Sequence, residues 1–75
     1  MEIIKVSIVT FEDLLEMRRY DEINNLFELL SSWVDQSYGI SVIREKYSGT
    51  YDELTLIKPG DHDHLKNFIR QFIPQ

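Results

Sequence analysis

Residues 40–58 read ISVIREKYSGTYDELTLIK, and this stretch determines how the rest of the chain can fold. It holds two runs rich in β-branched residues, 40–47 and 53–58, separated by Ser48-Gly49-Thr50-Tyr51-Asp52. Such runs around a short segment containing glycine are typical of a β-hairpin. We therefore predict two antiparallel strands joined by a loop over residues 48–52.

Upstream of the hairpin, residues 2–9 read EIIKVSIV and alternate in polarity, with Ile4, Val6 and Ile8 on one side. This pattern predicts a strand with one buried face. Thr10 then precedes a segment of helical character, which the pair Arg18-Arg19 interrupts. We predict a short helix over 11–18, beginning after Thr10, and a longer one over 22–36 capped by Asp21 and ended by Tyr38-Gly39. A single bent helix is the alternative. The longer helix is indicated by apolar residues at helical spacing: Ile23, Leu26, Phe27, Leu30, Trp33 and Val34.

Downstream of the hairpin, Pro59-Gly60-Asp61 ends the last strand and begins a final helix. Its apolar residues follow the i, i+3, i+4, i+7, i+8 spacing of one helix face. They are Leu65, Phe68, Ile69, Phe72 and Ile73.

The whole chain, residues 1–75, is predicted to form a single small α+β domain of order β-α(broken)-β-β-α. Each helical unit has one apolar stripe, so both should cover the same face of a three-stranded mixed sheet. The position of the first strand in that sheet stays open. The other face is expected to lack a cover, and its residues are predicted to be Ile3, Val9, Ile43 and Ile57 among Lys5, Ser7, Ser41, Glu45 and Thr55.

Charge is distributed unevenly along the chain. The formal net charge is −5, and residues 10–37 alone hold seven acidic side chains against the two basic ones Arg18 and Arg19. Direct binding to nucleic acid requires a basic stripe that neutralises phosphates. We therefore expect no nucleic-acid binding, whereas a larger protein with a basic surface would be attracted to the helical segment.

The residue content also excludes several classes of protein. The chain has no cysteine, no phosphate-binding glycine motif and no enclosed pair of catalytic carboxylates. We read Asp61-His62-Asp63-His64 as a capped helix start with solvated histidines rather than a metal site, because successive helical residues point in different directions. We expect no enzymatic activity, no cofactor and no metal. Without a secretory signal or a long apolar run, the protein is expected to be cytoplasmic.

Two families share the predicted element order. With YGISVI at 38–43 and LTLI at 54–57 ahead of a final helix, the chain resembles KH-type RNA-binding domains, but residues 17–22 read MRRYDE where those domains have a Gly-x-x-Gly loop. It is also similar to the small recombinase modulators of the DinI-like family, whose acidic residues lie in the C-terminal helix. Here the acidic residues lie in the first helical unit, so we take both resemblances as shared topology without membership.

The leading hypothesis is a binding or inhibitory module whose acidic helical face docks on a basic protein. A phage- or mobile-element-encoded antagonist of a nucleic-acid-handling enzyme suits this type of chain, because carboxylates can occupy a groove made for phosphates. The alternative that the acidic face serves only solubility stays open. The predicted contact residues are Glu12, Asp13, Glu16, Asp21, Glu22, Glu28 and Asp35.

The second hypothesis is an assembly subunit that forms a homodimer, or joins a complex, through the uncovered sheet face. Tyrosine is favoured at protein interfaces, and Tyr47 and Tyr51 flank the hairpin loop. The predicted interface is therefore Ile3, Val9, Ile43, Ile57, Tyr47 and Tyr51.

Overall fold

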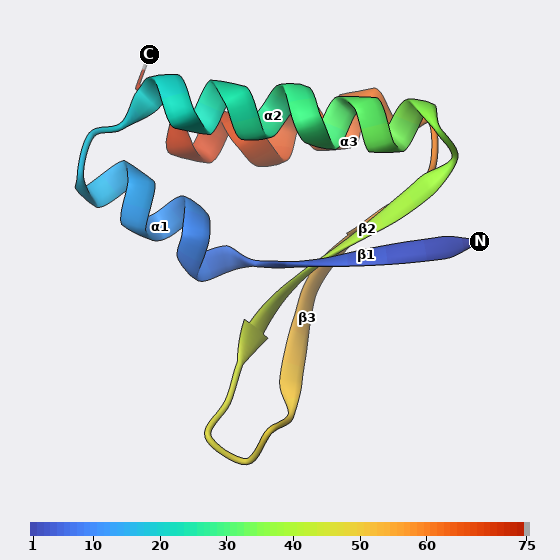
Figure 1. Cartoon of the computed structure of the whole chain (residues 1–75), viewed down its shortest axis with the longest axis horizontal. Helices are drawn as coiled ribbons and strands as arrows, with labels where there is room; N and C mark the ends of the chain where they lie inside the picture. The colour runs from blue at the N-terminus through green and yellow to red at the C-terminus, as the bar shows by residue number, and fades with distance from the viewer. Residues whose placement is uncertain (75) are drawn as a thin grey trace.

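A computed structural model of the chain describes residues 1–74. Among these residues the chain forms a three-stranded sheet and three α-helices, whose arrangement can be followed in Figure 1. The strands lie in the order β1-β2-β3, with β1 parallel to β2 and β2 antiparallel to β3. The predicted α+β class and mixed sheet are confirmed, and β1 is an edge strand. The elements are β1 (Glu2–Ser7), α1 (Ile8–Glu16), α2 (Tyr20–Asp35), β2 (Tyr38–Glu45), β3 (Tyr51–Ile57) and α3 (His62–Ile69), followed by a 3-10 turn at Arg70–Phe72.

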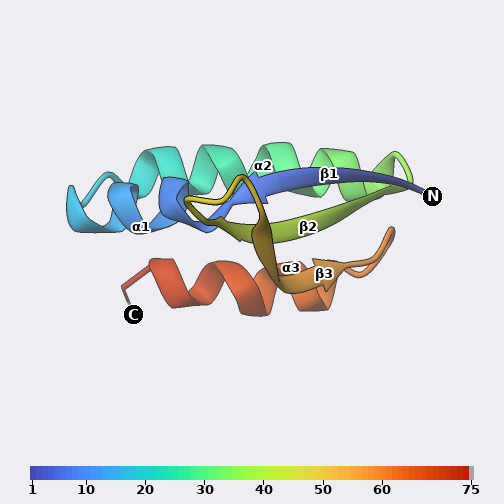
Figure 2. The ribbon, with the colours of Figure 1, turned by 90° about the horizontal axis from the view of Figure 1, so that it is seen from below.

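The core lies between the sheet and the helices, which cover one face of the sheet (Figures 1 and 2). The sheet contributes Ile40, Val42 and Ile57, all fully buried. An aromatic cluster fills the end of the core beneath α1, where the ring centroid of Phe11 lies 5.2 Å from that of Phe68. This cluster ties α1 to the C-terminal helix, because the two rings belong to those two elements.

The first strand is shorter than predicted. It ends at Ser7, whose hydroxyl oxygen accepts a hydrogen bond from the Val9 backbone N–H at 3.3 Å, so Ser7 and not Thr10 caps α1. Ile8 and Phe11 are buried at helical spacing and pack in the core. Tertiary packing therefore overrides the β preference of Ile8 and Val9.

The helix ends differ from the prediction as well. Within residues 1–74, two residues other than glycine adopt the left-handed conformation, Arg18 after α1 (φ 55°) and Ser37 after α2 (φ 72°). Gly39, predicted to end the long helix, instead lies inside β2 opposite Ile3. Asp21 is not the N-cap of α2, because the helix already begins at Tyr20.

We expect Ser37→Gly to raise the free energy of unfolding by about 0.5–1 kcal/mol, because glycine adopts positive φ without the steric cost of a Cβ atom. Urea denaturation followed by tryptophan fluorescence measures this difference. Gln36→Gly is the matched control, since Gln36 has φ −85° and gains nothing from glycine. Equal changes in the free energy of unfolding for both substitutions would contradict the left-handed conformation of Ser37.

A bulge in β3 changes which of its side chains face the helices. Val42 pairs with Thr55, but the next residue, Ile43, pairs with Glu53, so Leu54 is an extra residue in β3. One extra residue switches the alternation of a strand to the opposite faces. Ile57 therefore points into the core.

The predicted uncovered face needs three corrections. Ile57 is fully buried. Thr55 points toward α3, where its hydroxyl lies 2.9 Å from His64 Nε2. Val9 belongs to α1 and not to the sheet. We call the side of the sheet away from the helices the outer sheet face, and the register places there Ile3, Lys5 and Ser7 of β1, Gly39, Ser41, Ile43 and Glu45 of β2, and Tyr51, Glu53, Leu54 and Leu56 of β3.

Candidate protein-binding surfaces

The seven acidic residues predicted to form one face are divided by the structure. Glu12 accepts a hydrogen bond from Arg44 in β2 at 3.0 Å, and this bond raises the pKa of the Arg44 guanidinium. Asp35, at the far end of α2, lies 2.7 Å from His62 Nε2. Glu16 follows Glu12 by about one helical turn and shares its side of α1. These three acidic residues therefore lie apart from the other four.

A shallow groove runs between α1 and α2. Its floor is apolar. Leu29 of α2 lies in this floor and remains 44% exposed. A single exposed leucine is ordinary, but a row of leucines between two helices is a surface that a further apolar side chain can cover. The groove is lined by Thr10 and Leu14 of α1 and by Glu22, Asn25, Leu26 and Leu29 of α2.

Carboxylates border this groove on both sides. Residues three or four apart on a helix are surface neighbours. Asp13 follows the groove residue Thr10 by three positions, and Asp21 and Glu28 lie four before and three after Asn25. All three carboxylates are on exposed residues. We call Asp13, Asp21 and Glu28, together with the groove they border, the acidic-rimmed groove.

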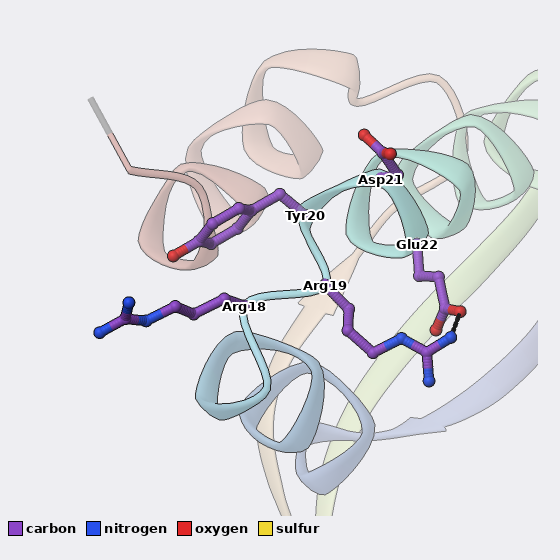
Figure 3. Close-up of a pocket in the computed structure, with 5 residues that line it drawn as sticks. All are labelled: Arg18, Arg19, Tyr20, Asp21 and Glu22. Atoms are coloured by element: carbon purple, nitrogen blue, oxygen red, sulfur yellow. Dashed lines mark hydrogen bonds and ion pairs between the residues drawn. The ribbon is translucent and has the colours of Figure 1, made fainter.

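The corner between α1 and α2 contains the two basic residues of the segment. Figure 3 shows the side chains of Arg19 and Glu22 directed toward each other, and they form an ion pair. Arg18 and Tyr20 point to the opposite side of the chain (Figure 3). Arg19 thus offsets the charge of Glu22, and the excess negative charge at the groove comes from the three rim carboxylates.

The outer sheet face carries exposed apolar side chains. Ile3 and Leu54 are 47% and 49% exposed, and Met1, which precedes β1, is 72% exposed. The residues predicted for this face did not include Leu54, because the bulge that places it there has no signature in the alternation of the strand. The face therefore carries exposed apolar side chains on both edge strands, although three of the residues predicted for it, Val9, Thr55 and Ile57, are absent from it.

The centre of the outer sheet face is closed by its own side chains. The Lys5 ammonium lies 4.3 Å from the centroid of the Tyr51 ring, so Lys5 reaches across β2 above Ile43. This contact explains why Ile43, predicted to be exposed, is only 6% exposed. Ser41 is also buried, and its hydroxyl has no hydrogen-bond partner among residues 1–74. Tyr47, in the loop, is fully exposed.

The histidines of α3 do not converge on a common point. His62 faces Asp35 of α2, whereas His64 faces Thr55 of β3 and lies 3.9 Å from Asp61. In the part of the chain that the structure describes, no group of three or more histidine, cysteine or acidic residues could hold a metal ion. No helix among these residues is long and apolar enough to cross a membrane.

The fold and these surfaces define a small α+β domain with one open sheet face and one groove between helices. No protein-family model matches the chain, and no curated protein or solved structure is significantly similar to it. The chemistry of these two surfaces therefore indicates what the domain can bind.

Proposed function

We propose that this domain is a protein-binding module that docks a basic, amphipathic segment of a larger protein in the acidic-rimmed groove. The observation that carries the proposal is the combination of an apolar floor with carboxylates on both borders. An amphipathic helix with apolar residues at i, i+3, i+4 and i+7 is the kind of segment that lies in such a groove.

The two parts of the groove contribute differently to binding. Covering Leu26 and Leu29 removes apolar surface from water and supplies most of the affinity. The rim carboxylates attract a basic partner and fix its orientation, and they increase the association rate more than the affinity. Binding is therefore expected to weaken only partly as salt screens the exposed charges.

The spacing of the carboxylates favours a peptide over a groove built for nucleic acid. Asp21 and Glu28 are seven residues apart on α2, which places them about 10 Å from one another along the helix axis. Phosphates follow one another at about 3.4 Å of axial rise along a DNA strand. One specific form of this proposal is an antagonist of a nucleic-acid-handling enzyme. In that form, the docked basic segment is part of the enzyme's own phosphate-binding site.

Isothermal titration with a helical peptide of about 18 residues, with leucine on one face and lysine on the other, tests the groove. We expect Asp21→Lys/Glu28→Lys to weaken binding about tenfold or more, because two attractive charges become repulsive. Glu2→Lys/Glu16→Lys makes the same change in net charge away from the groove and should leave binding within about twofold.

A second control separates the groove from attraction by charge alone. A peptide of the same composition with scrambled order keeps its charge but loses its apolar face, and it should bind much more weakly. Equal binding of both peptides, or no effect of the reversal at Asp21 and Glu28, would refute the proposal. If a natural partner binds the wild type but not the Asp21→Lys/Glu28→Lys variant, duplex DNA can be tested as a competitor for that partner. Competition by the DNA would identify the antagonist form.

A further inference from the structure

We infer that β1 binds an extended, uncharged segment of a partner protein, which adds to the sheet as a fourth strand. In the order β1-β2-β3, β1 pairs with β2 on one side only, and we call its other side the free edge of β1. An edge strand presents a row of unpaired backbone N–H and C=O groups, which is a template for another strand. The free edge shares no residue with the acidic-rimmed groove, so strand addition there is a function beyond the one proposed above.

The backbone of β1 is regular, and the groups on its free edge are unused. Residues 2–7 pair with residues 38–43 of β2 in one continuous register. Within residues 1–74, no backbone hydrogen bond other than those to β2 involves residues 2–6. Alternate residues of a strand turn their N–H and C=O groups toward opposite edges, so about three residues of β1 present both groups at the free edge. Another extended chain is the partner that pairs with such a row.

The opposite edge of the sheet is protected, whereas the free edge of β1 is not. The edge strand β3 carries a bulge at Leu54 and the acidic residues Asp52 and Glu53, and bulges and charges both hinder strand addition. In the interior of β1 the one charged residue is Lys5. Its ammonium lies 4.3 Å from the centroid of the Tyr51 ring on β3, so the side chain reaches across β2 and away from the free edge. Lys5 therefore does not protect the edge on which it lies.

The side chains of β1 indicate what the added strand carries. Ile4 and Val6 lie on the helix side of the sheet but are only half-buried, whereas the residues paired with them in β2 are fully buried. Apolar side chains of an added strand would lie beside Ile4 and Val6 and remove their exposed surface from water. The charges of Glu2 and Lys5 cancel, so β1 as a whole is neutral. These features favour an uncharged strand in which every second residue is apolar.

The charge of the helices disfavours a second copy of the chain as the added strand. The helices cover one face of the sheet (Figure 2), so two copies joined at β1 would place their helices on the same face of one continuous sheet. Residues 10–37 of each copy hold seven acidic and two basic side chains, which is the whole net charge of −5. Surfaces of like sign that are brought together repel each other. An uncharged segment of a different protein meets no such repulsion.

Hydrogen exchange of the full chain, resolved by residue with NMR, tests the inference. The probe is a peptide of about eight residues in which valine alternates with threonine, with both ends blocked so that it carries no charge. We expect alternate amides of β1 to exchange rapidly in the free protein. When the peptide is bound they should exchange about tenfold more slowly or slower still, because they become hydrogen-bonded. The amides of β3 are the internal control, and their exchange should not change.

Two N-methylated forms of the peptide show whether binding uses one edge of the added strand. Methylation of the valine nitrogens removes the backbone donors from one edge of the peptide, and methylation of the threonine nitrogens removes them from the other. One form should bind about tenfold more weakly or worse, because its hydrogen bonds to β1 are lost. The other form should bind within about threefold of the unmodified peptide.

Three results would overturn the inference. The first is no binding of the unmodified peptide up to about 1 mM. The second is equal binding of the two N-methylated forms, since strand addition uses one edge only. The third is protection of the β1 amides that rises with the concentration of the chain alone, which would assign the free edge to a second copy. The Asp21→Lys/Glu28→Lys variant should bind the extended peptide like the wild type, so failure here is distinguishable from failure of the groove proposal.

Discussion

Phe11→Ala is expected to unfold most of the molecules at 25 °C. Phe11 is fully buried, and its ring lies 5.2 Å from Phe68 and 5.3 Å from Phe72 between centroids. Truncating a buried phenylalanine costs about 3–5 kcal/mol, and the loss of two aromatic contacts adds to that cost. A domain of this length has a total stability near the low end of about 5–15 kcal/mol, so the loss is as large as the whole stability or larger.

The effect of Phe11→Ala can be measured by urea denaturation, with the fluorescence of Trp33 reporting unfolding. Phe27→Ala is the matched control, because Phe27 is only half-buried on α2 and the same atoms are removed. We expect the control to lose less than half as much stability. A loss below about 1.5 kcal/mol for Phe11→Ala would mean that α1 does not pack on α3 through this aromatic cluster.

The substitution Ile57→Lys should abolish folding, whereas Leu54→Lys in the same strand should be tolerated. Ile57 is fully buried opposite Ile40, so lysine there would place an unpaired charge in the core. The cost exceeds about 4 kcal/mol, which is close to the whole stability of a domain of this size. Leu54 is 49% exposed on the outer sheet face, where the lysine ammonium reaches water.

Circular dichroism of both variants measures whether each of them is folded. A folded Ile57→Lys variant would mean that β3 pairs without its bulge, because Ile57 would then point to the outer sheet face. Unfolding of Leu54→Lys would place Leu54 in the core instead. Either result would require a different register between β2 and β3.

Local sequence patterns predicted most of the elements. The helical spacing of apolar residues in 22–36 and 65–73 predicted α2 and the C-terminal helical segment, since a helix face must be apolar where it meets a core. The runs on either side of Gly49 predicted the hairpin for a similar reason, although its loop lies over residues 46–50 and not over 48–52. The sequence also predicted that the helices share one face of the sheet.

Element boundaries depended on contacts that the local pattern does not encode. Ile8 and Val9 suit a strand or a helix, and Ile8 is helical because it packs in the core with Phe11. Ser37 takes a left-handed conformation although Gly39 lies two residues away, because the helix ends before Gly39 is reached and Gly39 is already a residue of β2.

The charge distribution follows from the sequence alone, because it is a count of residues along the chain. The grouping of those charges was decided only by the tertiary structure. Glu12 pairs with Arg44, 32 residues away, and Asp35 pairs with His62. The angle between α1 and α2 brings Asp13 and Glu28 to one groove. Likewise the bulge at Leu54 decided which side of β3 faces water, because one extra residue reverses the alternation of a strand without changing its composition.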